Sequence, residues 1–183
     1  MKIDLMRTLG VLSAAALLLA APGFAGKTSS PDVTVLVKQA TAKIRANPQF
    51  KKAVLLEADG TPADGSTTKA SGVTHWRIVF QNQTTKRSKY ASAWIKVVNG
   101  KLGQVHGVKS PFVEDRNITV IPKMTLAAAV AKLRKAGHTE PFEAVTLRWP
   151  LGPKKGETLY IFSYDSGANW AVGTKSGKVK RLT

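Results

Sequence analysis

Two segments of the chain carry apolar residues at three- and four-residue spacing, which is typical of a helix with one buried face. Ser30 is placed to cap the first helix, with Pro31 in its first turn, and Asn47-Pro48 ends it. Thr125 caps the second helix and Gly137 closes it. The two predicted apolar stripes are Val33, Leu36, Val37, Ala40 and Ile44, and then Leu126, Ala129, Val130 and Leu133.

Short β-prone runs follow each predicted helix. We expect strands over residues 50–57, 74–81, 90–98 and 102–108, then 142–149, 159–164 and a hairpin over 170–182. Asn99-Gly100 is the strongest hairpin turn in the chain, because both residues tolerate positive φ. Residues 57–72, with two Asp-Gly pairs, read as a long loop.

The segments 90–105 and 170–182 follow one scheme of tryptophan, β-prone run, glycine turn, lysine and apolar strand. An aromatic strand and a helix precede each of them. The pattern predicts an α+β fold of two similar helix-plus-antiparallel-sheet units in tandem, over residues 26–116 and 117–183. Each unit alone would bury a marginal core, so we expect the two units to pack together.

The order of helix, strand and closing Gly–Lys–Val hairpin resembles the PepSY family of small exported domains. The resemblance rests on TLAAAVAKL from Thr125, on residues 170–179 and on residues 94–105. It implies an inhibitory or binding role in the cell envelope rather than catalysis. The architecture is also similar to the β-lactamase inhibitory proteins, but those rely on cysteines and this chain has none.

The N-terminus has the features of an export signal. Residues 1–7 hold two basic residues, residues 9–21 are an apolar run, and small residues precede a predicted cleavage after Ala25. An uncleaved membrane anchor is the alternative interpretation. Residues 1–25 are therefore predicted to be a signal peptide, and the mature protein to be periplasmic or secreted.

The net charge is +17, and removal of the signal peptide leaves +16, with both predicted units basic. The positive electrostatic field of such a protein attracts anionic surfaces. In the envelope these are lipid headgroups, anionic glycans and acidic proteins, so nucleic acid is an unlikely partner there. The absence of cysteine excludes a disulfide framework and a thiolate site.

The motifs of common catalytic sites are incomplete. Ser66-Thr-Thr-Lys69 matches the S-x-x-K of penicillin-recognising enzymes, but it lies in a turn-rich loop rather than at a helix start. His75, His106 and His138 are scattered, without metal-ligand spacing. No catalytic residue, cofactor or metal ion is predicted.

Aromatic residues interleaved with basic ones suggest a recognition surface. In 90–98 the odd positions form the apolar face, so Trp94 is expected on the other face with Tyr90 and Lys96, and Arg77 lies opposite Trp76. Stacking and charge together suit a glycan, a lipid headgroup or an acidic protein. The alternative is that a helix covers this face and Trp94 belongs to the core.

Three further residues complete the candidate binding set. Asp59 and Asp64 lie in the predicted loop 57–72, and we include them because long loops are often functional. The alternative is that this loop is only a mobile hairpin tip. The two carboxylates lack the ligand order of a calcium loop. Trp170 holds the place of Trp94 in the second predicted unit.

These observations predict an exported, non-enzymatic binding or inhibitory module that acts on another envelope protein, with a hydrolase as one possible target. The alternative is a basic accessory protein that binds anionic envelope polymer or lipid headgroups.

Overall fold

The computed structural model describes residues 31–83, 88–113, 115–152 and 156–182. The predicted signal peptide lies outside these residues. Two helices and eight strands follow in the order α1 (Val33–Arg45), β1 (Ala53–Pro62), β2 (Val73–Asn82), β3 (Ser92–Val98), β4 (Lys101–Val108), α2 (Leu126–Lys135), β5 (Ala144–Arg148), β6 (Leu159–Ser163), β7 (Asn169–Gly173) and β8 (Val179–Leu182). Two 3-10 turns, η1 (Pro48–Phe50) and η2 (Ala70–Gly72), flank β1 and β2.

The strands form one antiparallel sheet in the order β4-β3-β2-β1-β5-β6-β7-β8. The prediction of two tandem helix-plus-sheet units is therefore wrong. β1 pairs directly with β5, from Glu57 opposite Arg148 to Gly60 opposite Val145. In two separate sheets, the backbone N–H and C=O groups on one side of each of these strands would be unpaired, and the β1–β5 pairing satisfies them. The proposed boundary after Arg116 falls between β4 and α2.

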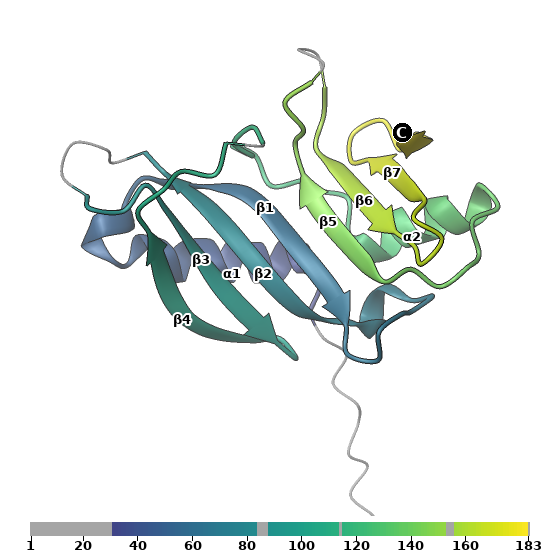
Figure 1. Cartoon of the computed structure of the whole chain (residues 1–183), viewed down its shortest axis with the longest axis horizontal. Coiled ribbons are helices and arrows are strands. Elements are labelled where there is room, and N and C mark those ends of the chain that lie inside the picture. The colour runs from purple at the N-terminus through teal and green to yellow at the C-terminus, as the bar shows by residue number, and fades with distance from the viewer. Residues whose placement is uncertain (1–30, 84–87, 114, 153–155, 183) are drawn as a thin grey trace, which may run out of the picture.

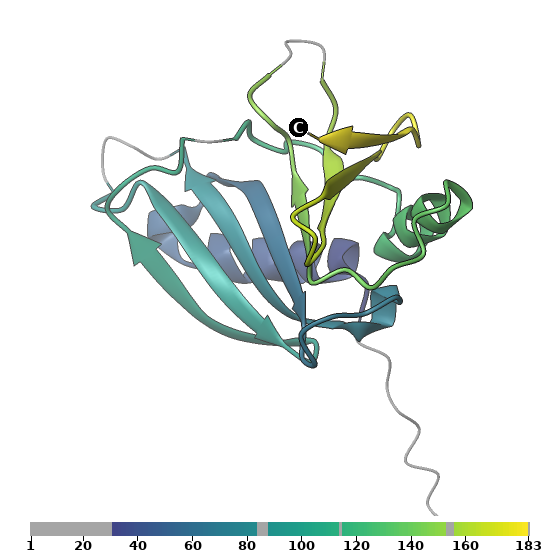
Figure 2. The ribbon, with the colours of Figure 1, turned by 45° about the vertical axis from the view of Figure 1, so that its right-hand side comes forward.

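Both helices lie on one side of this sheet, as the two views show (Figures 1 and 2). All nine residues of the two predicted apolar stripes are buried in one core with the sheet side chains beneath them, which confirms the helical patterns. Ile78, Ile95 and Phe162 are fully buried on this helix-covered face. No helix of the described residues is long and apolar enough to cross a membrane.

The ends of the helices agree with the sequence only in part. Thr125 caps α2 by accepting from the Ala128 N–H at 3.1 Å, and Gly137 follows the helix at φ +94°, as predicted. Asp32 rather than Ser30 caps α1, accepting from the Thr34 N–H at 2.9 Å. Ser30 itself lies outside the described residues.

Two strand predictions need correction. Residues 58–62, expected in a loop, continue β1 as far as Pro62, and Phe50 lies in η1 before the strand begins. A bulge between Leu55 and Glu57 lets β1 continue along β2 after a change of register. The Asn99-Gly100 turn is confirmed, with φ of +49° and +77° between β3 and β4.

Candidate functional site

The register of five strands brings polar side chains together on the sheet face opposite the helices, which we call the open face. One cross-strand row runs Thr146, Asp59, Arg77 and Lys96, from β5 through β1 and β2 to β3. The neighbouring row runs Arg148, Glu57, Val79, Trp94 and His106, and reaches β4. Directly opposed side chains on one face lie close enough to interact.

Arg77 holds the centre of the open face. Its guanidinium pairs with Glu57 at 3.0 Å and with Asp59 at 3.3 Å. The Asp59 carboxylate also accepts from the Thr146 hydroxyl at 3.1 Å. Arg77 thus joins β2 to two positions on β1, and its side chain is still half exposed.

A second arginine pairs beside the first. Arg148 contacts the Asp115 carboxylate at 2.6 Å, and the side chain of Asp115 is 1% exposed. Burial raises the pKa of Glu57, and the nearby Asp115 carboxyl raises it further, while Arg77 opposes the rise. Burial and the Glu57 charge likewise raise the pKa of Asp59. The open face therefore carries carboxyl groups whose ionisation is costly, and the neighbouring arginine stabilises their charged form.

Next to this network, Trp94 stacks on His106 with ring centroids 4.1 Å apart and planes 12° from parallel. Trp94 is half-buried and His106 is exposed. A depression of about 380 Å³ lies beside Trp94. Its lining is Asp59, Thr61, His75, Trp76, Arg77, Trp94 and Lys96. The depression has an aromatic wall, and its rim holds basic and acidic side chains. Such a site suits a ligand surface that carries both apolar and polar groups.

Four of the seven predicted binding residues line this one depression: Asp59, Arg77, Trp94 and Lys96. Trp94 faces away from Ala93 and Ile95 as expected, and neither helix lies on its side of the sheet (Figure 1). The interpretation that a helix covers Trp94 is therefore wrong.

The other three predicted residues lie elsewhere. Tyr90 stacks on Phe50 at 5.7 Å and lies against Gly107, so it packs on the helix-covered core rather than beside Trp94. Asp64 is an exposed turn residue beyond the end of β1. Trp170 points to the helix-covered side, since it pairs across from Phe162.

Sequence reasoning passed over two groups of this site. Glu57 stands at the junction of the predicted strand 50–57 and the predicted loop 57–72, and its alternation with Asp59 and Thr61 along β1 is the signal that could have identified it. Phe112, whose ring lies 5.8 Å from the Arg77 guanidinium carbon, comes from the irregular segment after β4, where no periodic pattern could place it.

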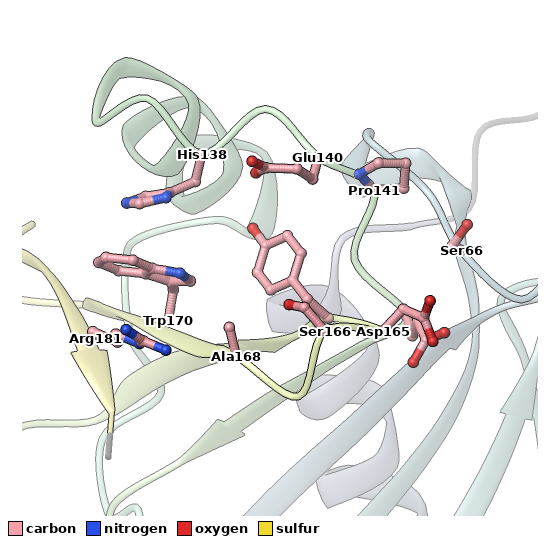
Figure 3. A pocket seen from close by; sticks show the side chains of 11 residues that line it. Ser66, His138, Glu140, Pro141, Asp165, Ser166, Ala168, Trp170 and Arg181 are labelled. Carbon is pink, nitrogen blue, oxygen red and sulfur yellow. The ribbon is translucent and has the colours of Figure 1, made fainter.

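Trp170 lines a second pocket of about 660 Å³. His138 lies over one face of its indole, with ring centroids 3.6 Å apart, and Arg181 lies on the other side of the ring (Figure 3). The three histidines do not converge: His75 and His106 are on the open face and His138 is here. The described residues hold no group of three or more metal-ligating side chains.

No protein-family model matches the chain, and neither a characterised protein nor a solved structure matches it significantly. The resemblance to PepSY domains therefore stays a prediction from the sequence pattern.

Proposed function

We propose that the protein is a non-enzymatic binding protein of the cell envelope, which recognises another envelope protein through the open face around Trp94. The observation that carries the proposal is the stacked Trp94–His106 pair beside a depression edged by Arg77, Lys96 and Asp59. A large aromatic side chain held in place by a neighbour loses little conformational freedom on binding. Tryptophan and arginine are also the residues that most often dominate protein interfaces.

The charge network supports the same proposal. Arg77 is fixed by the Glu57 and Asp59 carboxylates of the neighbouring strand β1, so this part of the rim of the depression is ordered before a partner arrives. Pre-organised charges favour specificity and rapid association more than raw affinity.

The test is capture from an envelope extract at moderate salt, followed by measurement of the affinity of the purified captured protein. We expect Trp94→Ala to weaken that affinity by about thirtyfold, the effect of a residue that dominates an interface. Val35→Ala, on the exposed side of α1, is the matched control and should bind normally. Unchanged affinity in Trp94→Ala would refute the assignment of this face.

A second function, binding of anionic envelope polymer or lipid headgroups, is supported by a different observation. The ion pairs between described side chains use arginine, and none of them uses a lysine. The positive charges of the lysines in this part of the chain are therefore not offset by an ion pair there and can attract external anions. Binding to vesicles containing anionic lipid should then be strong at low ionic strength and fall steeply by physiological salt. Retention of a protein partner at that salt separates the two functions.

A further inference from the structure

Exposed aliphatic side chains gather in two neighbouring segments of the chain. Four large hydrophobic residues are exposed within the described residues: Val35, Val113, Val120 and Leu151. Val35 is on α1, whereas the other three lie between β4 and α2 or between β5 and β6. These two segments meet above β5 in Figure 1 and remain side by side in Figure 2. We call their described residues, 111–113, 115–123, 149–152 and 156–158, the loop margin.

Direct contacts hold the two segments of the loop margin together. They pair antiparallel at Asp115 and Pro150, and the Arg116 guanidinium donates to the Leu151 carbonyl oxygen at 2.6 Å. Because the pairing is antiparallel, the chain just before Asp115 lies beside the chain just after Pro150. The first carries Val113 and the second carries Leu151, so these two exposed side chains lie on adjacent, mutually fixed segments.

Val120 belongs to the same margin because it shares a groove with Trp149. The groove has a volume of about 510 Å³, and its apolar wall is formed by Val120, Ile121, Pro122 and Trp149. Trp149 is half-buried and directly precedes Pro150, so the groove adjoins the paired segments. Single exposed aliphatic residues are common on soluble proteins, but here three of the four lie on segments that meet at one tryptophan. Tryptophan is also enriched at membrane interfaces.

Lysines accompany this apolar surface. Lys123 and Lys175, the latter from the turn between β7 and β8, line the groove and are exposed. Neither forms an ion pair within the described residues. Glu157 also lines the groove, but its carboxylate accepts from the backbone N–H groups of Lys175 and Ser176 at 2.6 and 2.9 Å. The lining therefore carries two ammonium groups against one carboxylate that is bound to the turn.

We propose that the loop margin docks the protein on the surface of an anionic lipid bilayer. The three aliphatic side chains enter the boundary between headgroups and acyl chains, and Lys123 and Lys175 contact the lipid phosphates. Shallow apolar insertion and attraction to anionic lipid add to each other in this mode of binding. The inference rests on the second of the two functions proposed above, for which it supplies the ligand and the site. The groove and the Trp94 depression share no lining residue.

The absence of cysteine gives a direct test of the docking surface, because a single introduced cysteine carries a label at one known position. The processed, exported protein is labelled with an environment-sensitive nitrobenzoxadiazole group at Val113→Cys, Val120→Cys or Leu151→Cys, with Val35→Cys as the matched control. The probe is a vesicle of phosphatidylglycerol and phosphatidylethanolamine at low ionic strength. We expect the emission of the three margin labels to shift to shorter wavelength, and that of the Val35→Cys label to stay as in water.

The affinity for the same vesicles measures the apolar contribution. The variant Val113→Ser/Val120→Ser/Leu151→Ser should bind about tenfold more weakly, because it removes the apolar surface that enters the bilayer. Val35→Ser makes the same kind of change on α1 and should bind like wild type.

The charged contribution is measured in the same way. Lys123→Gln and Lys175→Gln should each bind about fivefold more weakly, the effect of one lysine at an anionic membrane surface. Lys38→Gln removes an exposed charge from α1 and should have less than half of that effect.

The outcomes separate this inference from the function on which it rests. Failure of wild type to bind the vesicles would contradict that function, and the inference with it. If wild type binds, then full binding by the serine variant, unshifted margin labels, or an equal shift at Val35→Cys would overturn only the loop margin as the site. Dextran sulfate is anionic but has no acyl chains, and an equal shift of the margin labels with it would assign the surface to soluble polyanions instead of lipid.

Discussion

Asp32 and Leu126 are joined across 94 residues by a hydrogen bond of 2.8 Å, from the Leu126 N–H to the Asp32 Oδ2. The other oxygen, Oδ1, accepts from the Thr34 N–H at 2.9 Å. One carboxylate therefore lies at the N-termini of both helices, where exposed N–H groups and the helix dipole favour negative charge. Asp32 thus caps α1 and adds to the Thr125 cap of α2, so both helices share its carboxylate.

Asp32→Ala should consequently destabilise the protein more than the loss of an ordinary cap. Removal of one cap costs about 1 kcal/mol, and both helix ends are affected here, so we expect a loss of about 2 kcal/mol in the free energy of unfolding. Asp32→Asn keeps one acceptor and should lose about half as much. Urea denaturation measures these changes, and Asp64→Ala should leave stability unchanged. Equal stability of Asp32→Ala and wild type would contradict the shared cap.

Arg77→Met should weaken the fold in a way that depends on pH. Burial raises the pKa values of Glu57 and Asp59, and the Arg77 guanidinium lowers them; without it, both pKa values rise further. A raised carboxyl pKa stabilises the fold below the unfolded pKa, and this contribution is lost as pH rises through the folded value. We therefore expect a loss of about 1–3 kcal/mol at pH 8 that shrinks as the carboxyl groups become protonated.

Urea denaturation of Arg77→Met at pH 8 and at pH 4.5 measures this difference. The triple variant Arg77→Met/Glu57→Gln/Asp59→Asn removes the carboxylates as well, and should show no such pH dependence. If Arg77→Met loses the same free energy of unfolding at both pH values, the ion pairs with Glu57 and Asp59 do not determine the loss of stability.

Glu157 should show the opposite dependence on pH. Burial would raise its pKa, but hydrogen bonds from Ser176 and from the Lys175 N–H outweigh this and lower it. The two N–H groups lie 2.6 and 2.9 Å from the same carboxylate oxygen. A lowered pKa stabilises the fold above the unfolded value, and the contribution is lost as pH falls through the folded value.

Glu157→Gln should therefore lose about 1 kcal/mol at pH 7 and almost nothing at a pH where wild-type Glu157 is protonated. The melting temperature followed from neutral to acid pH gives the comparison. Glu143→Gln, an exposed carboxylate without a partner in the described residues, is the control. If the melting temperatures of wild type and Glu157→Gln change in parallel as the pH falls, the predicted contribution of the Glu157 hydrogen bonds is excluded.

Gly60→Ala tests the packing at the centre of the sheet. A Cβ atom at Gly60 would lie 2.6 Å from the Trp76 ring and 2.7 Å from Val73. Trp76 is buried, so the ring has little room to move, and overpacking of this kind costs about 1–3 kcal/mol. Chemical denaturation provides the measurement. Gly152→Ala, where nothing lies within 4 Å of the added atom, should be neutral.

Local patterns in the sequence predicted the elements well. The two apolar stripes, the Asn99-Gly100 turn and the direction of Trp94 depend on neighbours within a few residues, so periodicity and turn chemistry define them. Tyr90 shows where this reasoning stops. Alternation placed it with Trp94, but β3 begins only at Ser92, and before that point the chain need not alternate.

Long-range relationships could not be predicted in the same way. Nothing in the spacing of residues indicates that β1 pairs with β5, because either strand could equally form the edge of its own sheet. The Asp32–Leu126 hydrogen bond and the Asp115–Arg148 ion pair follow from that pairing. The candidate site was found in part because Arg77, Trp94 and Lys96 lie on neighbouring strands, whereas Glu57 and Phe112 required the three-dimensional fold.

The central position of β1 and β5 also determines where the sheet can be extended by another polypeptide. Within the described residues only β4 and β8 have a free side. β8 carries Lys180 and Arg181, and β4 begins at Lys101, so two copies meeting edge to edge would bring like charges together. The basic composition thus opposes self-association into fibrils while leaving both margins open to an acidic strand.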